Sequence, residues 1–190
     1  MKIHQPAELI QDAKVALQML KEGNERYLKG DLTSKATYAA DREVLATGQK
    51  PFAVIVTCAD SRVAPEIFFD QKLGDIFIVR NAGNVADPTA LGSLEYAVEH
   101  LKSKLVVVCG HSKCGAVTAA CSGGDLPPNI KSITDRIQPA VAKGGDVDVV
   151  IHNNVRVMVD MIKADEFVKK NDVTVVGAYY DVHTGVVEWL

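Results

Sequence analysis

Two short segments of the chain carry side chains that can bind a metal ion. Residues 58–62 (CADSR) follow one apolar run of the sequence, and residues 110–115 (GHSKCG) follow another. The HxxC spacing of His111 and Cys114 lets both side chains face one point from a loop that enters a helix, where the helix amides favour a thiolate. With Cys58 they form a Cys2His set. Three protein ligands and one open position are typical of a catalytic zinc site, because a structural zinc takes a fourth protein ligand.

Asp60 and Arg62 flank Ser61 and can pair with each other. An arginine fork fixes the orientation of a carboxylate and keeps it ionised. Beside a metal, such a carboxylate can accept a hydrogen bond from a metal-bound water and direct the oxygen lone pair toward a substrate. Taken alone, however, an Asp–Arg pair at this spacing is more simply interpreted as a salt bridge that fixes the loop.

The other two cysteines fit a metal site poorly. Cys109 lies inside an apolar run, and Cys121 lies about two helical turns beyond Cys114. We interpret both as fillers of the core or the surface. Two phosphate-binding motifs do not fit: Cys58 to Arg62 is too short for a phosphatase loop of Cys, five residues and Arg, and no glycine-rich loop ends in Gly-Lys-Ser/Thr.

The elements that must position these side chains follow from the hydrophobic pattern. Short β-branched runs without alternation are typical of parallel strands buried on both faces, and they occur at residues 52–56, 76–79, 105–108 and 173–176. Apolar residues at helical spacing lie between them, at 91–101, 130–141 and 151–162. Ligands of such folds bind beyond the carboxyl ends of the strands, where both reactive segments lie.

These elements predict an α/β fold with a central, mostly parallel β-sheet flanked by helices. We expect about four parallel strands plus a C-terminal edge strand, which follows a turn at residues 183–185. A helix of about two dozen residues after Pro6, ending near Gly30, predicts an N-terminal helical extension. The whole chain, 1–190, is expected to form one domain, with a helical arm at 1–48 and a catalytic core at 49–190.

Composition excludes several classes of protein. The hydrophobic share of 47% excludes a disordered chain, and 21 Lys and Arg against 24 Asp and Glu give a net charge of −3, which makes nucleic acid a poor partner. The N-terminus lacks the apolar core of a secretory signal, and no apolar run approaches the roughly 20 residues that span a bilayer. We therefore expect a soluble, cytoplasmic protein with no nucleic-acid or membrane partner.

The chain resembles the β-class carbonic anhydrases from about Ala7 to its C-terminus. The segments that carry the resemblance are residues 58–62 (CADSR), 79–84 (VRNAGN), 92–97 (GSLEYA) and 110–115 (GHSKCG). The resemblance implies Zn²⁺ on Cys58, His111 and Cys114, with an Asp60–Arg62 dyad that orients the zinc-bound water or hydroxide. The implied reaction is the reversible hydration of carbon dioxide, in which zinc hydroxide attacks CO2 and bicarbonate and a proton leave. It also implies that the first and third strands are neighbours in the sheet.

The plant-like branch of the family adds a substrate pocket. The resemblance places it here on Gln49, Phe77, Ala82, Tyr96 and Gly115, with Gln49 nine residues before Cys58. The glutamine amide would donate to a CO2 or bicarbonate oxygen, and the two aromatic rings would form an apolar wall. Without the resemblance, both rings fit core-facing patterns. In this family the pocket lies at a dimer interface, so a homodimer or dimer-based tetramer is expected, with the N-terminal helix clasping the neighbour.

Two other functions remain open from the sequence. Carbonyl sulfide or carbon disulfide hydrolysis uses the same ligands on close relatives of this scaffold. A zinc or thiol redox sensor that binds a partner is the second, but it would not need Asp60, Arg62 or Gln49.

The resemblance also bears on regulation. Some bacterial relatives bind a second bicarbonate near the site, which breaks the Asp–Arg pair and lets the aspartate replace water on zinc in an inactive state. Their pocket uses a tryptophan three residues before the first cysteine ligand, an arginine and a C-terminal tyrosine. Here Arg80 and Tyr180 occupy the last two positions, but Ile55 stands at the tryptophan position. Isoleucine has no indole N–H, so we expect the open form, with Asp60 paired to Arg62 near neutral pH.

Overall fold

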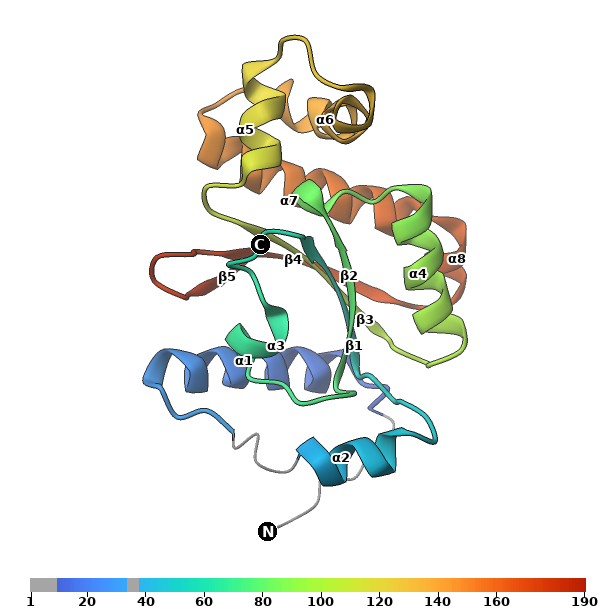
Figure 1. Ribbon diagram of the computed structural model, residues 1–190. Helices are drawn as coiled ribbons and strands as arrows, with labels where there is room; N and C mark the ends of the chain where they lie inside the picture. The colour runs from blue at the N-terminus through green and yellow to red at the C-terminus, as the bar shows by residue number, and fades with distance from the viewer. Residues whose placement is uncertain (1–9, 34–37) are drawn as a thin grey trace.

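The computed structural model describes residues 10–33 and 38–190 (Figure 1). In this part of the chain one five-stranded sheet has the order β2-β1-β3-β4-β5. The first four strands are parallel, and the last pairs antiparallel with β4, as predicted. The strands are β1 (Ala53–Cys58), β2 (Ile76–Asn81), β3 (Leu105–His111), β4 (Thr174–Tyr180) and β5 (Val187–Trp189).

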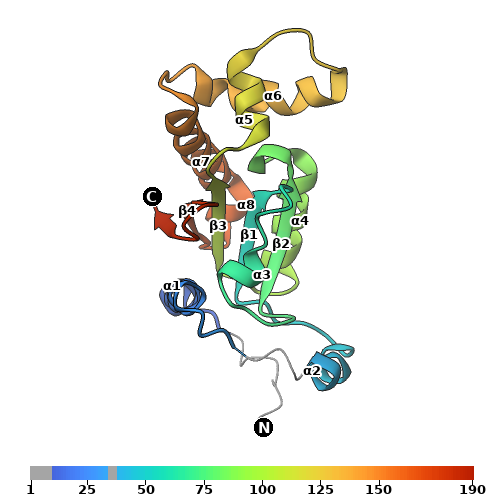
Figure 2. The ribbon, with the colours of Figure 1, turned by 60° about the vertical axis from the view of Figure 1, so that its left-hand side comes forward.

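The two central strands are the most apolar. Every residue of β1 and β3 is buried, which is why their sequences are continuous hydrophobic runs rather than alternating ones. The buried hydroxyl of Thr57 donates to the carbonyl of Cys109 at 2.9 Å, so the one polar side chain of β1 is satisfied. Figure 2 shows the four parallel strands side by side. The neighbouring β1 and β3 bring two reactive segments to the same edge of the sheet.

Helices cover both faces of the sheet (Figure 1). On one face lie α4 (Pro88–Glu99), α7 (Val147–Ala164) and α8 (Glu166–Lys170); on the other lie α1 (Ala13–Lys29) and α3 (Pro65–Phe68). The short η1 (Ala82–Asn84) follows β2, whereas α5 (Gly115–Ser122) and α6 (Pro128–Val141) lie beyond the carboxyl end of β3. The remaining helix, α2 (Tyr38–Leu45), precedes β1. The sequence pattern did not predict α2, α3, α8 or η1.

The first helix is shorter than predicted. It spans 17 residues, because the Asp12 carboxylate accepts from the amides of Lys14 and Val15 and caps it there, and it ends at Gly30 in the left-handed conformation (φ 70°). The predicted helical residues 7–9 lie outside the described part.

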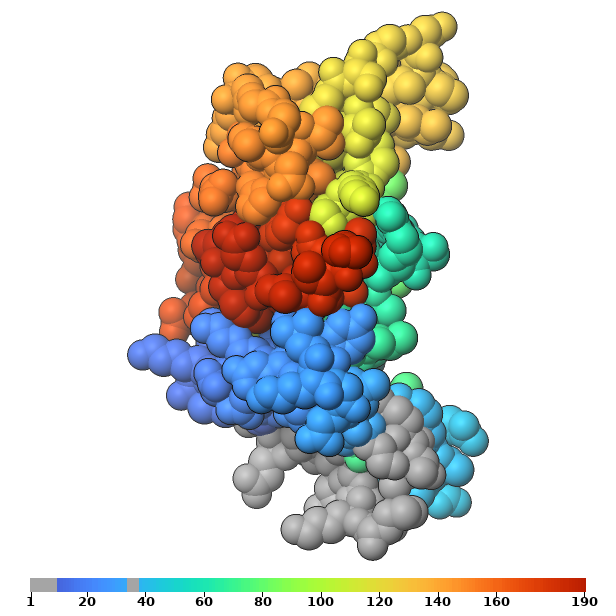
Figure 3. Space-filling model, turned by 90° about the vertical axis from the view of Figure 1, so that its left-hand side faces the viewer, coloured from blue at the N-terminus to red at the C-terminus, as the bar shows by residue number. Residues whose placement is uncertain are grey.

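The same helix packs against the C-terminal segment of its own chain (Figure 3). The Asn24 amide donates to the carbonyls of Phe68 and Gly185 at 3.0 and 2.9 Å and accepts from the amide of Val187 at 3.1 Å. This one buried side chain therefore joins α1, α3 and the β4–β5 hairpin. No helix within the described ranges is long and apolar enough to cross a membrane.

Candidate metal centre

Three side chains converge at the carboxyl edge of the sheet. Cys58 is the last residue of β1, His111 is the last residue of β3, and Cys114 is the N-cap of α5. Their donor atoms all lie within 4.8 Å of one another, and the residues are 5%, 0% and 1% exposed. Because β1 continues into α3 on one face and β3 into α5, the set lies where the chain leaves the sheet in two directions, the usual position of a ligand site in α/β folds.

The two neighbouring sulfur atoms shift each other's pKa in opposite directions. The Cys114 thiol donates to Cys58, which lowers the pKa of Cys58 to about 4 against the opposing effect of burial. The same hydrogen bond, together with burial, raises the pKa of Cys114. The amide of Gly83 also donates to the Cys58 sulfur at 3.3 Å. A divalent cation that binds here would displace the proton of the Cys114 thiol, because thiolates are the form of cysteine that ligates metals.

His111 is oriented for ligation by its second nitrogen. Nδ1 lies 2.9 Å from the carbonyl oxygen of Ser112, which makes Nδ1 the protonated nitrogen and leaves a lone pair on Nε2. Nε2 is buried and has no hydrogen-bond partner among the described residues. A ligating histidine commonly donates its other N–H to a carbonyl in this way. The orphaned nitrogen and the two sulfurs together fit a zinc ion better than a packed apolar core.

Asp60 and Arg62 form a two-pronged pair beside these three residues. Nε and one terminal nitrogen of Arg62 donate to the two carboxylate oxygens at 2.9 and 2.7 Å, and the Arg62 amide donates to the first oxygen at 2.9 Å. These hydrogen bonds hold the pKa of Asp60 well below its usual range. Arg62 also donates to the Lys113 carbonyl at 3.3 Å and so links the two reactive loops. The carboxylate is not a member of the three-residue metal-ligand group.

Arg80 supports the same loop from β2. Its Nε donates to the carbonyl of Cys58 at 2.9 Å, and a terminal nitrogen donates to the carbonyl of Asp60 at 2.8 Å. Tyr180 contacts other residues than Arg80 does. Its hydroxyl is 3.4 Å from that of Tyr27, and its ring stacks on Phe68 with 4.3 Å between centroids. Ile55 is fully buried in β1. The sequence alone did not show that Arg80 acts through two backbone carbonyls.

Two of the expected pocket residues, Ala82 and Gly115, adjoin the metal-ligand group. Phe77 lies at the amino end of β2, where it pairs with Val54 rather than with Cys58, and Tyr96 lies beside it. Ala82 begins η1, and Gly115 begins α5 directly after Cys114. The rings of Phe77 and Tyr96 are 6.3 Å apart between centroids, Phe77 being half-buried. Tyr96 is 49% exposed, so the core-facing pattern on α4 does not bury it.

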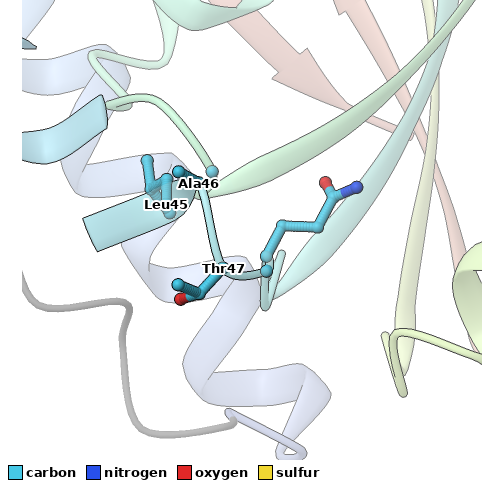
Figure 4. Close-up of a pocket in the computed structure, with 6 residues that line it drawn as sticks. Leu45, Ala46 and Thr47 are labelled. Carbon is cyan, nitrogen blue, oxygen red and sulfur yellow. The ribbon is translucent and has the colours of Figure 1, made fainter. Parts of the chain in front are cut away.

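Gln49 lies away from the metal-ligand group within this chain. It precedes the amino end of β1, whereas Cys58 is at the carboxyl end. Its side chain is exposed and lines a hollow of about 440 Å³ formed by the end of α2 and the following loop, with Gly74. Leu45, Ala46 and Thr47 mark this hollow in Figure 4. A single chain therefore does not bring Gln49 and the three ligands together.

The comparisons with known proteins agree with this geometry. A family model described as carbonic anhydrase matches residues 53–187. The chain belongs to the carbonic anhydrase family. It is 50% identical to carbonic anhydrase 2 of Mycobacterium tuberculosis over 133 residues, which are 68% of this chain and 64% of the relative. The carbonic anhydrase of Mycolicibacterium smegmatis is 45% identical over the same length, 68% and 65% of the two chains. The matched part thus spans less than two thirds of both relatives.

Solved structures place the family member in the β-class. The β-carbonic anhydrase of Coccomyxa, solved with acetazolamide, has a TM-score of 0.74 at 29% identity, over 92% of this chain and 86% of that one. A tetrameric β-carbonic anhydrase of Sordaria macrospora has a TM-score of 0.73 at 24% identity, over 93% and 97%. The second likeness concerns the fold alone.

Proposed function

We propose that this carbonic anhydrase family member catalyses the reversible hydration of CO2 to bicarbonate and a proton, with zinc bound by Cys58, His111 and Cys114. The observation that carries the proposal is the convergence of these three donors, with Nε2 of His111 buried and unpartnered in the described structure. An ionised carboxylate beside them distinguishes this arrangement from that of a thiol sensor, which needs no such group.

The chain's own residues would prepare a water molecule for attack on CO2. Zinc held by Cys58, His111 and Cys114 would supply a Lewis acid, which lowers the pKa of water toward neutrality. Asp60 would accept a hydrogen bond from the attacking water, because its pKa is low and it remains an acceptor throughout the working range. Arg62 donates two hydrogen bonds to that carboxylate and Arg80 donates one to the backbone carbonyl of Asp60, so the acceptor is held in one orientation. The water oxygen would form a bond to the carbon of CO2 as one C=O π bond opens onto its oxygen, and the water O–H bond would release a proton to buffer, which leaves bicarbonate.

A second copy of the chain would complete the substrate pocket. Phe77 and Tyr96 would form its apolar wall and Ala82 and Gly115 its floor, with the Gln49 amide donating to a substrate oxygen. Gln49 lies at the wrong end of β1 to reach its own metal-ligand group, and Tyr96 is half-exposed although aromatic. Both features support a homodimer, or a tetramer built from dimers, in which one chain covers the site of another.

We also propose that the site belongs to the plant-like, open subtype. Arg80 is committed to the carbonyls of Cys58 and Asp60, and Ile55 has no donor to offer an anion. A buried polar partner that cannot be satisfied costs about 1–3 kcal/mol, enough to weaken binding of a second bicarbonate roughly 5- to 150-fold. Asp60 would therefore remain paired with Arg62. All four cysteines are free, which supports action in a reducing compartment such as the cytoplasm.

One experiment tests the function. Zinc content and CO2 hydration are measured on the purified chain before and after chelation, with carbonyl sulfide and carbon disulfide hydrolysis assayed side by side. We expect about one zinc per chain and hydration that is lost with the metal and restored by zinc. Hydration by a metal-free preparation would contradict the proposal. Faster turnover of either sulfur compound than of CO2 would favour the hydrolase instead, although the relatives named above are carbonic anhydrases.

A further inference from the structure

One polar residue interrupts the buried face of α7. Asn154 is 1% exposed and lies among apolar neighbours on the helix such as Ile151, Val155 and Met158. Its Nδ2 donates to the carbonyl of Gly83 at 3.0 Å, but its Oδ1 is buried and without a partner in the described part of the chain. An apolar side chain of similar size would remove the unpaired Oδ1 but would leave the buried Gly83 carbonyl without this donor. Packing alone therefore does not account for an asparagine here.

The residue that Asn154 contacts touches the metal-ligand group. The Gly83 amide donates to the Cys58 sulfur at 3.3 Å, while the Gly83 carbonyl accepts from Asn154. Gly83 has φ +75°, and an added Cβ would lie 2.9 Å from Ile137 Cδ1 and 3.1 Å from Ala116 Cβ. The positive φ favours glycine here, and glycine has the least intrinsic restraint on its own backbone. The direction of its N–H therefore depends on what holds the neighbouring peptide.

We infer that Asn154 is a positioning residue for the metal centre, acting through Gly83 on Cys58. By holding the Gly83 carbonyl on the α7 side, the Asn154 amide keeps the Gly83 N–H directed at the Cys58 sulfur on the other. An N–H that donates to a ligating thiolate orients it and stabilises its charge, as outer contacts of metal ligands generally do. This inference rests on the proposed zinc site and names a residue 71 positions from Gly83 that would tune it.

The test is zinc affinity in Asn154→Leu, which keeps the side-chain volume and removes only the donor and the unpaired acceptor. Affinity is measured by competition with a chromophoric chelator, and the cobalt-substituted protein gives the intensity and energy of the thiolate-to-cobalt band. We expect zinc to bind about 10- to 100-fold more weakly and the band to shift. The unfolding midpoint of the metal-free protein should change little, because the substitution removes one unpaired acceptor, Oδ1 of Asn154, and leaves another, the Gly83 carbonyl, without its donor.

The matched control is Asn153→Leu. Asn153 is the preceding residue of α7 and also donates to a backbone carbonyl, that of Gly144 at 3.4 Å, far along the chain from the ligands. The Asn153→Leu protein should bind zinc with an affinity within about twofold of that of the parent protein. Asn154→Ala, read by the same two measurements, replaces the leucine variant if that one does not fold.

Unchanged zinc affinity and an unchanged cobalt band in a folded Asn154 variant would overturn the inference while leaving the proposed function intact. If the parent chain itself fails to bind zinc, the proposed function fails and the inference with it. The two failures are therefore distinguishable in one set of titrations.

Discussion

Four cysteines of one chain differ in chemistry because their surroundings differ. Cys109 is enclosed in β3, and burial raises its pKa to about 12, so it remains a neutral thiol. Cys58 is also buried, but the hydrogen bond from Cys114 lowers its pKa to about 4. A buried thiolate is stable only where donors or a cation compensate the loss of water. The position of each cysteine at a strand end or within a strand, rather than its residue type, thus decides which can ligate a metal.

Replacing a proposed ligand should remove bound zinc, whereas replacing a cysteine outside the metal-ligand group should not. Cys114→Ser removes a thiolate donor and should abolish retention of zinc on gel filtration, and CO2 hydration with it. Cys121→Ser is the control: Cys121 lies on the same helix, half-buried and outside the metal-ligand group, and its loss should leave zinc content and hydration unchanged. Metal analysis of the two variants checks this. Full zinc in the Cys114 variant would exclude that residue as a ligand.

Asp60→Asn should separate orientation of the water from binding of the metal. The amide can present a donor where an acceptor is required, so kcat should fall on the order of 10²–10⁴-fold while zinc content stays at the parent level. Folding lowers the pKa of Asp60, so its charge contributes above the ordinary aspartate pKa and is lost only as pH falls through the lower folded value. The activity ratio of the two proteins should therefore be constant between pH 6 and 9. Near-normal turnover would reduce the Asp60–Arg62 pair to a loop-fixing salt bridge.

At the scale of elements, the sequence predicted what hydrophobic pattern and strand ends determine. All strands, including the edge strand, and the helices later labelled α4, α6 and α7 were confirmed, because their apolar periodicity is continuous. The helix α3 was missed because it spans only four residues. The sequence named Arg80, within the 79–84 segment, but not its two backbone carbonyl partners, and it did not single out Asn154, whose inferred role also runs through a backbone carbonyl. The available signal was a lone polar residue on an apolar helix face.

Two helix glycines should respond in opposite ways to alanine. In Gly23→Ala the new Cβ of α1 would overlap the carbonyl oxygen of Phe69, whereas in Gly92→Ala the Cβ on α4 meets nothing within 4 Å. Helix propensity favours alanine by about 1 kcal/mol at both sites. Overpacking typically costs about 1–3 kcal/mol, so Gly23→Ala should lower the free energy of unfolding and Gly92→Ala should raise it. Urea unfolding measures both, and stabilisation of the Gly23 variant would show that α1 does not sit against α3.

At the scale of the whole molecule, the three proposed metal ligands gather at the carboxyl end of the sheet. The three ligands lie where β1 and β3 end, and Gln49 lies before β1 begins. A six-residue strand is about 20 Å long, which is beyond the reach of a glutamine side chain. If Gln49 serves the reaction, it serves a site on another copy of the chain. In that case the substrate pocket is complete only in the proposed oligomer.

Mixing two inactive variants tests this directly. Gln49→Leu keeps the ligands but lacks the amide, and His111→Ala keeps the amide but lacks a ligand. Co-expressed with different tags and purified as hybrids, they should recover activity, because one site per hybrid dimer combines intact ligands of one chain with Gln49 of the other. If Gln49 acted within its own chain, no hybrid site would hold both, and activity would stay at the level of the single variants. The rate per hybrid dimer should approach half the rate per parent dimer, since only one of the two sites in the hybrid is complete.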